Sequence, residues 1–598
     1  MDYTFVELKE ILRRNDEYML FHEKSLIKEH ALDPFFAQRL NDLSNIAEEA
    51  KAKRPWIPTL SDYRVFQDTG MAEEYFEWYA ERRKFLNALV FMAIVTEDDS
   101  YLPYVEDYIW AIIQTYKWTT PRDPEFYEER GRDGVPHEEC LDLLSTETGF
   151  TFAEIDALLG DRLSQFIRRH MKQASLKRIV YSFSNKTYYH WWETCNINWA
   201  AVCGCSVAGT AMYYLEDSDE LAEILLRILQ TMKCFLDGYQ DDGVCVEGIS
   251  YWKYGFSYFV FFCELLRERT NGEIDLMQDE KVHQIALFLQ RCRLGENEIL
   301  NFGDSEQRLS YQIGFIHMLK TYFSDVEVPP SRYVENYHQE RRHRWAGFIR
   351  DFAWFKKEFV QDDKDVLIDN HYFEKSQIYI AHKNGTCFAV LGGHNGYIHG
   401  HNDLGHFVYY VGGKGIFIDI GQGAYTREYF GAQRYTIINT GSAGHSVPLV
   451  NDEVQQEGTE YCVTEMHTVH GACDVVGMDI TKAYECPGLE RLYRIFEYQA
   501  DGTLCICDRI CTKGTSSITE SFVVSVTEEP ILEDGKVILK KDDITVCLLY
   551  DKRFRSLSIE KISSENITAC DDQGMRIIRM NTQMESGCGE YRFTIFKC

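Results

Sequence analysis

Histidine and aspartate gather between residues 393 and 447, in a glycine-rich stretch flanked by apolar, β-patterned runs. Imidazole is the commonest side-chain metal ligand and exchanges protons near neutral pH. The pattern therefore favours a metal or catalytic site, although any single one of these histidines could instead be a loop residue bonded to the backbone. The residues are His394, His399, His401, His406, Asp419 and His445.

Part of this stretch has the composition of a zinc site. Two imidazoles and a carboxylate are a sound ligand set, with water or another side chain as the fourth ligand. The set is His401, Asp419 and His445. His399 lies two residues before His401, so in a strand both would share a face. If the next two apolar runs form a simple hairpin, Asp419 is far from His401 unless the chain folds back, which Gly400 and Gly405 would permit.

Two polar motifs in the first half of the chain could also do chemistry. In the sequence CNINW, Asn196 or Asn198 either caps the small-residue helix that follows or faces a site. A glycine-broken turn over residues 241–255 leads into an aromatic helix start, where Tyr251 and Tyr254 lie three residues apart on one face. These tyrosines are either core residues or hydroxyl groups that face a cleft after a polar loop.

The elements that must position these residues change type along the chain. Up to about residue 355 apolar residues recur every three or four positions, which predicts helices, for example over 75–95, 152–170 and 199–214. From about residue 376 the period is two, with Gly, Asp and Asn turns between strands. The predicted fold is α+β and multidomain, with many antiparallel helices before an antiparallel β-sandwich. The predicted domains are 1–355, 356–530 and a small β region at 531–598.

Composition narrows the classes of partner. The formal net charge is −31, with 63 Lys+Arg against 94 Asp+Glu, so nucleic acid is an unexpected partner. No apolar run is long enough to span a membrane, and the charged start of the sequence carries no secretory signal. The nineteen cysteines include no CxxC pair. We therefore expect reduced, mostly buried thiols and a cytoplasmic protein.

Four motifs, taken together, resemble the heparinase II/III-type polysaccharide lyases. They are NxNWAAVCxxxxAG, DGxxxEGxxYWxYG, HGHND followed by GIFIDIG, and a later GH, and they span about residues 196–445. Each motif is weak alone, but their joint order is specific. The resemblance implies an α/α toroid followed by an antiparallel β-sandwich, which agrees with the change of period.

The resemblance also implies a reaction, β-elimination at a uronic acid. A base removes the proton on C5 and an acid protonates the departing O4. Tyr251 resembles the catalytic tyrosine, with Tyr254 as the alternate. His399 is a second candidate base, and together with Asn196 or Asn198 it resembles the groups that contact the carboxylate. The zinc would be structural and would pin the loop that carries His399 to the sandwich.

The remaining predictions concern the substrate and the rival functions. Candidate substrate-binding residues are Glu247, Trp252, Arg427 and Arg434. The arginines could bind a uronate or a sulfate, or pair with local acids. We expect a glycosaminoglycan-like oligo- or polysaccharide substrate and no organic cofactor, and the large helical surfaces would suit a homodimer. The alternatives are a glycoside hydrolase that uses paired carboxylates such as Asp241 and Glu247, and a non-catalytic glycan-binding protein.

Overall fold

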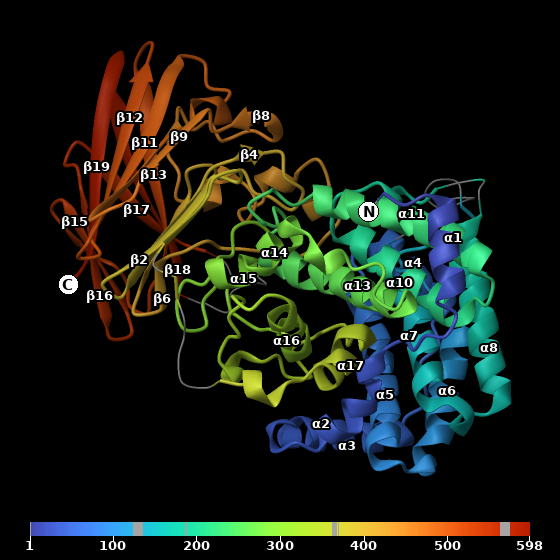
Figure 1. Ribbon diagram of the computed structural model, residues 1–598. Coiled ribbons are helices and arrows are strands. Elements are labelled where there is room, and N and C mark those ends of the chain that lie inside the picture. Colours follow the sequence, from blue (N-terminus) through green and yellow to red (C-terminus); the bar gives the residue numbers. More distant parts are fainter. Residues whose placement is uncertain are drawn as a thin grey trace. The chain divides into compact units, whose positions relative to one another are not determined.

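The change of period in the sequence is a change from helices to strands in the structure (Figure 1). The computed structural model describes residues 2–122, 135–185, 187, 189–361, 367–368, 370–562 and 574–598. Helices from α1 (Phe5–Arg14) to α17 (Trp345–Ala353) precede strands from β1 (Asn370–Phe373) to β19 (Gly587–Lys597). The predicted fold class, a helical region followed by antiparallel sheets, is therefore confirmed.

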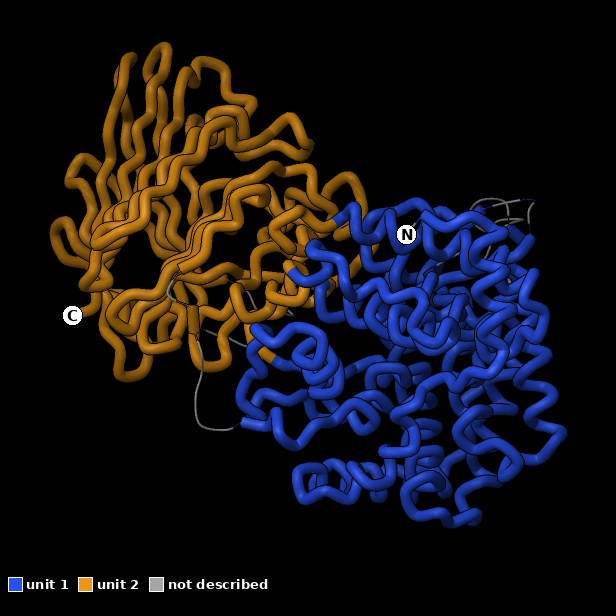
Figure 2. The backbone as a smooth tube through the Cα atoms, viewed as in Figure 1, with its two compact units in different colours: residues 1–238, 252–283, 310–362 blue, residues 239–251, 284–309, 363–598 orange. Residues whose placement is uncertain are grey.

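The chain forms two compact units that do not coincide with its two halves (Figure 2). Unit 1 consists of residues 1–238, 252–283 and 310–362, and unit 2 of residues 239–251, 284–309 and 363–598. Two segments from the helical half thus belong to the unit that contains the sheets. The three predicted domains stay a prediction, but a single border near residue 355 misses these two segments.

Helix α10 (Asn198–Tyr214) is the buried centre of unit 1. Small residues let its neighbours approach closely, since a Cβ added at Gly209 would lie 2.5 Å from the ring of Phe150. The other helices of nine or more residues that the structure describes in this unit are α1, α3 (Ala37–Ala52), α4 (Leu60–Thr69), α5 (Glu73–Thr96), α6 (Leu102–Ile113), α7 (Leu143–Leu159), α8 (Gln165–Ser175), α11 (Ser218–Asp237), α13 (Ser257–Arg269), α16 (Ile313–Tyr322) and α17. In the part of the chain that the structure describes, no helix combines the length and the apolar character that a membrane span requires.

The helix predicted over 152–170 is wrong, because two helices share this range. Helix α7 ends at Leu159, and Gly160 follows with φ 53°, a conformation that glycine adopts without strain. Helix α8 then begins at Gln165, where the Ser164 side chain accepts a hydrogen bond from the amide of Ile167. The apolar period continues across both helices and hides the break between them.

Unit 2 contains two large antiparallel sheets and one strand pair. The nine-stranded sheet has the order β1, β2 (Ile378–Lys383), β3 (Thr386–Leu391), β5 (Phe407–Val411), β6 (Lys414–Phe417), β13 (Ser516–Ser525), β18 (Met575–Met584), β17 (Ser556–Lys561), with β7 (Leu449–Val450) beside β13. The eight-stranded sheet has the order β14 (Ile531–Glu533), β15 (Lys536–Lys541), β16 (Ile544–Tyr550), β19, β12 (Leu504–Thr512), β11 (Leu489–Gln499), β10 (Cys473–Asp479), β9 (Glu465–Val469). Strand β4 (His394–Asn395) pairs with β8 (Gly458–Cys462).

One continuous apolar core is built from strands of both large sheets. Aromatic rings from both sheets pack within it among aliphatic side chains, and they include Phe388, Phe407, Phe417 and Phe522 of one sheet and Phe496 and Phe593 of the other. Strands from residues 531–598 take part in both sheets, where we expected a small sheet of their own. The C-terminal stretch therefore completes the sandwich.

One pair of cysteines departs from the expectation of reduced thiols. Cys511 on β12 and Cys588 on β19 form a disulfide. The two residues face each other in the register of these neighbouring strands, with Cα atoms 4.0 Å apart. They are 77 residues apart in the chain, so the spacing of cysteines in the sequence gave no sign of the pair.

Candidate active site

Tyr251 ends the short helix α12 (Ile249–Tyr251), in one of the two helical-half segments that belong to unit 2. Its hydroxyl oxygen is 3.3 Å from Nδ1 of His399 and 2.5 Å from the hydroxyl oxygen of Tyr425. The rings of Tyr251 and His399 are stacked, with centroids 4.4 Å apart. The structure thus brings together the two groups on which the predicted reaction depends.

The surroundings of Tyr251 keep its hydroxyl protonated. Burial raises the pKa of this hydroxyl well above its ordinary value, and the negative charge of Asp304 raises it further. A tyrosine hydroxyl can act as a base near neutral pH only if its pKa is lowered. A neutral phenol near neutral pH suits the donation of a proton instead.

His399 lies in a loop, so the case of a strand, in which it would share a face with His401, does not apply. Residues 396–406 form turns between β4 and β5. His399 has φ 61°, the left-handed region that few residues other than glycine adopt. Such conformations cost about 1–3 kcal/mol and cluster at functional sites. Gly405, with φ 85°, provides the predicted fold-back of the chain toward Asp419.

A buried carboxylate, Asp304, joins the groups of this loop. One of its oxygens, Oδ2, is 2.8 Å from Nδ1 of His399, and the other, Oδ1, is 3.1 Å from Nε2 of His401. The hydroxyls of Tyr425 and Tyr429 and the guanidinium of Arg434 also donate to it. Burial alone would raise the pKa of Asp304, but the hydrogen bonds from both histidines and the charge of Arg434 lower it below its ordinary value. Asp304 is therefore ionised.

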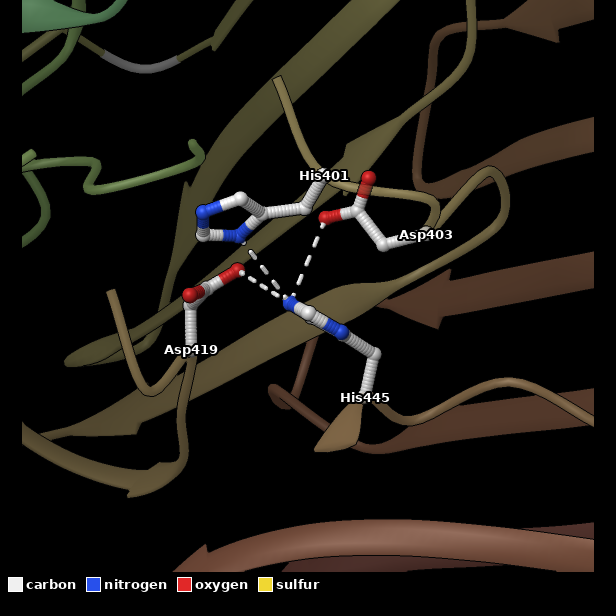
Figure 3. A group of neighbouring side chains, drawn as sticks. All are labelled: His401, Asp403, Asp419 and His445. Carbon is white, nitrogen blue, oxygen red and sulfur yellow. Dashed lines mark hydrogen bonds and ion pairs between the residues drawn. The ribbon is translucent and has the colours of Figure 1, made fainter. Parts of the chain in front are cut away.

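The predicted metal ligands lie together, and Asp403 joins them (Figure 3). One potential ligand atom from each of the four side chains lies within 4.8 Å of the others, and all four side chains are buried. Nε2 of His445 is 3.3 Å from Nδ1 of His401, and 3.7 Å from an oxygen of Asp403 and of Asp419. A tetrahedral zinc ion with bonds of about 2 Å places its ligands about 3.3 Å apart.

The hydrogen bonds around both imidazoles direct an unprotonated nitrogen toward the centre of this set. His401 donates its Nε2–H to Asp304, which leaves Nδ1 as the ligand nitrogen. His445 donates its Nδ1–H to the carbonyl of Gly441 at 3.0 Å, which leaves Nε2. His406 is different, because its Nδ1 accepts the amide of Ser446 and its Nε2–H faces Asp419. It therefore supports a ligand and is not one.

Asp403 provides a further test of the fit to a metal. Its side chain is buried, and within the described ranges neither carboxylate oxygen has a hydrogen-bond partner. A buried carboxylate without partners is costly, and the nearby charge of Asp419 adds repulsion. Burial and this charge raise the pKa of Asp403 well above its ordinary value. A divalent cation would compensate both carboxylates, so the residues fit the predicted ion.

The predicted substrate-binding residues of unit 2 differ in their surroundings. Glu247 is buried, with Oε1 3.8 Å from Nε2 of His399. Arg434 donates from Nη2 to Asp304 and to the carbonyl of Gly400, at 3.1 and 3.2 Å, so it stabilises the loop. Arg427 is exposed. The predicted substrate contacts of these three residues stay predictions.

Four predicted site residues belong to unit 1, and each has different neighbours or exposure. Trp252 is buried against Phe256 and Phe315, which fits the core alternative. The Tyr254 hydroxyl donates to Glu147 at 2.9 Å. The N-cap of α10 is Ile197, so neither asparagine of the CNINW motif caps this helix. Of the two, Asn196 is exposed and Asn198 is buried.

Sequence reasoning missed Asp403 as a ligand and gave Tyr425 and Tyr429 no role. The HGHND motif contains Asp403, and its adjacency to His401 was an available signal. Tyr425 and Tyr429 follow Asp419 closely in a glycine-rich stretch, which resembles the composition around the histidines. Asp304 was missed as well, because nothing local in the sequence indicates its hydrogen bonds to two histidines.

The chain has the fold of heparinase III, an α/α toroid followed by a β-sandwich. The match to heparinase III has a TM-score of 0.63 and 11% identity, and it covers 98% of this chain and 93% of that one. A heparan sulfate lyase from Pedobacter heparinus matches with a TM-score of 0.56 and 12% identity, over 97% and 93% of the two chains. A xanthan lyase from Paenibacillus matches with a TM-score of 0.54 and 9% identity, over 99% and 60%.

The sequence itself matches no family model and no curated protein. The structural likeness, at such low identity, establishes the fold. The chemistry must therefore be argued from the residues of this chain.

Proposed function

We propose that this chain is a polysaccharide lyase that cleaves uronate-containing glycans by β-elimination. The observation that supports this most directly is the contact between Tyr251 and His399, 3.3 Å apart beside a buried, ionised Asp304. It lies in a chain with the fold of heparinase III. An elimination requires one group that can accept a proton and one that can donate a proton close to the same sugar ring, and these two side chains are adjacent.

The proposed reaction moves two protons, breaks the C5–H and C4–O4 bonds and forms one carbon–carbon double bond. A base takes the C5 proton, the electrons of that C–H bond form a C4=C5 double bond, and the C4–O4 bond breaks. The oxygen leaves with a proton from an acid. His399 is the proposed base, through Nε2, because its Nδ1 is bonded to Asp304. Tyr251 is the proposed acid, and Tyr425 can pass it a proton across their 2.5 Å contact.

The developing charge on the substrate carboxylate needs a partner. Asn198 and Asn196 are the proposed partners, as the resemblance implies. Amide groups held in place at such a carboxylate lower the barrier more in a dry site than in water. Tyr254 stays the alternate to Tyr251, but its hydroxyl is engaged with Glu147.

We also propose that a zinc ion is held by His401, Asp403, Asp419 and His445. When bound, the ion supplies a fixed cross-link between the loop that carries His399 and the segments that carry Asp419 and His445. Metal analysis of the purified protein would distinguish zinc from calcium. Calcium prefers six to eight oxygen ligands, which this set does not offer.

The proposed substrate is glycosaminoglycan-like, of the heparan sulfate, chondroitin or hyaluronan type. The net charge of −31 disfavours long polyanions and favours short oligosaccharides that need only a local basic patch. The cytoplasm stays the proposed compartment. The thiols outside the disulfide support it, and the Cys511–Cys588 bond is unusual there. A homodimer likewise stays a prediction.

A screen of sulfated and unsulfated uronate oligosaccharides for ultraviolet absorbance of a new alkene tests the proposal. We expect absorbance with at least one class, and its loss in Tyr251→Phe with the fold intact. Full turnover in Tyr251→Phe would contradict the assignment. New reducing ends without absorbance, lost on changing Glu247 or Asp241, would favour a hydrolase. Affinity without any turnover would favour a glycan-binding protein.

A further inference from the structure

We infer that Asp304 is a positioning residue whose single carboxylate fixes both His399 and His401, and so couples the proposed base to the proposed metal site. The inference rests on the proposed function only for the identity of the reaction. The hydrogen bonds that carry it belong to one unit of the fold.

The two oxygens of Asp304 divide the contacts between the two imidazoles. Oδ2 accepts Nδ1–H of His399 at 2.8 Å, and Oδ1 accepts Nε2–H of His401 at 3.1 Å. Both oxygens are held in place by other donors. Arg434 and Tyr425 donate to Oδ2, at 3.1 and 3.3 Å, and Tyr429 donates to Oδ1. The carboxylate cannot turn toward one histidine without losing the other.

The backbone around Asp304 holds the same loop. Its amide donates to the carbonyl of His399 at 3.0 Å. Gly303 has φ 73°, and a Cβ added there would lie 2.9 Å from that carbonyl oxygen. His399 itself has φ 61°. Its unusual backbone is therefore held by contacts to residues 303–304, and its ring by the Asp304 side chain.

This arrangement determines which nitrogen of each imidazole is unprotonated and so can accept a proton or bind a metal. With Nδ1–H of His399 bonded to Asp304, Nε2 is the nitrogen that can accept a proton. With Nε2–H of His401 bonded to the same carboxylate, Nδ1 is the nitrogen that can bind a metal. One residue thus selects the tautomer of both rings. Loss of such outer hydrogen bonds typically costs about 10–100-fold in metal affinity or activity.

Asparagine at this position would preserve the shape but not the function. An amide offers one acceptor oxygen and one NH2 group, and the NH2 group would face an N–H of one of the histidines. Glutamate would keep the charge and displace it by one methylene. Asp304→Asn therefore tests the paired acceptors, and Asp304→Glu tests their position.

Asp474→Asn is a matched control in the same unit. Asp474 is also buried and also lies beside an imidazole, with Oδ1 2.8 Å from Nδ1 of His470. Lys383 contacts it at 2.9 Å, and the amide of Gly471 donates at 2.9 Å. It differs from Asp304 in that its histidine is neither a proposed base nor a proposed ligand.

The experiment measures kcat, KM and zinc affinity, the last by competition with a chelator, for the full-length chain and these variants. We expect Asp304→Asn to lower kcat about 100-fold with KM nearly unchanged, and to weaken zinc binding about 10–100-fold. Asp304→Glu should fold and still lose kcat. Asp474→Asn should keep both the kcat and the zinc affinity of the parent.

Three outcomes would overturn the inference. They are unchanged zinc affinity in Asp304→Asn, unchanged kcat in that variant, and full kcat in Asp304→Glu. A parent chain that eliminates no glycan would defeat the proposed function instead. The zinc measurement would then still decide whether Asp304 fixes His401, so the two failures can be told apart.

Discussion

Arg494 on β11 links the core of the sandwich to the metal loops, which are the loops around Gly405 and Ser446 that carry proposed metal ligands. Its side chain is completely buried and bonds to Asp508 at 2.8 and 3.0 Å. It also donates to the carbonyls of Gly405, at 3.0 Å, and of Ser446, at 2.7 Å. Gly405 precedes His406 and Ser446 follows His445. Arg494→Ala should therefore destabilise the fold and loosen the metal site together.

The size of the effect follows from the charges left behind. Without Arg494, the buried carboxylates of Asp508 and Glu520 have lost their cation. Removal of one partner from a buried pair costs about 3–5 kcal/mol. Unit 2 has about 275 residues, and an unfolding entropy of about 2.1 cal/mol/K per residue makes each kcal/mol worth about 1.7 °C in Tm, so unit 2 should lose about 5–9 °C. Burial already raises the pKa of Glu520, so one carboxyl group of the variant should take up a proton.

Arg350→Ala is the matched control for this prediction. Arg350 on α17 is equally buried and pairs with Glu154 at 2.7 Å, but it belongs to unit 1. Thermal unfolding and zinc affinity of both variants would be compared. We expect both to lose stability and only Arg494→Ala to lose zinc affinity. If the two variants bind zinc equally well, Arg494 does not hold the metal loops and the reasoning is refuted.

Three further predictions test the site and the fold. Tyr251→Phe should lower kcat about 10²–10⁴-fold, the range for loss of a general acid or base, and Tyr254→Phe far less, as measured by alkene absorbance. Burial lowers the pKa of His190 from 6.5 to about 4. The neutral imidazole therefore contributes about 2–3 kcal/mol of folding stability, which is present above pH 6.5 and is lost as the pH falls toward 4. Thermal unfolding of the parent at different pH values should show this loss, and His190→Gln should lessen it. Gly303→Ala should lower both kcat and Tm, because alanine is strained at φ 73° and its Cβ would press on the carbonyl of His399; unchanged kcat would mean that the loop adapts.

The fold and much of the site could be predicted from local patterns. The period of apolar residues distinguished helices from strands, and the buried helix α10 was predicted to within one residue at its start. The short polar motifs indicated Tyr251, His399 and the three predicted metal ligands, which lie close together in the structure. These features could be predicted because each depends on residues that are close together in the sequence.

Contacts between distant segments could not be predicted in this way. Asp304 is 95 residues from His399 along the chain, and its hydrogen bonds follow from the folded path of both segments. The Cys511–Cys588 pair depends on the register of β12 and β19. Gly160 ended a helix whose apolar period continued beyond it. In each case tertiary structure decided what the local pattern left open.

The membership of residues 239–251 and 284–309 in unit 2 limits how the protein can be dissected. A gene fragment that starts at residue 363 would encode the sheets and all four metal-site side chains, but not Tyr251 or Asp304. Such a fragment would be expected to lack the proposed acid. Chimaeras that exchange the sandwich with a protein of the same fold should therefore carry both upstream segments with it.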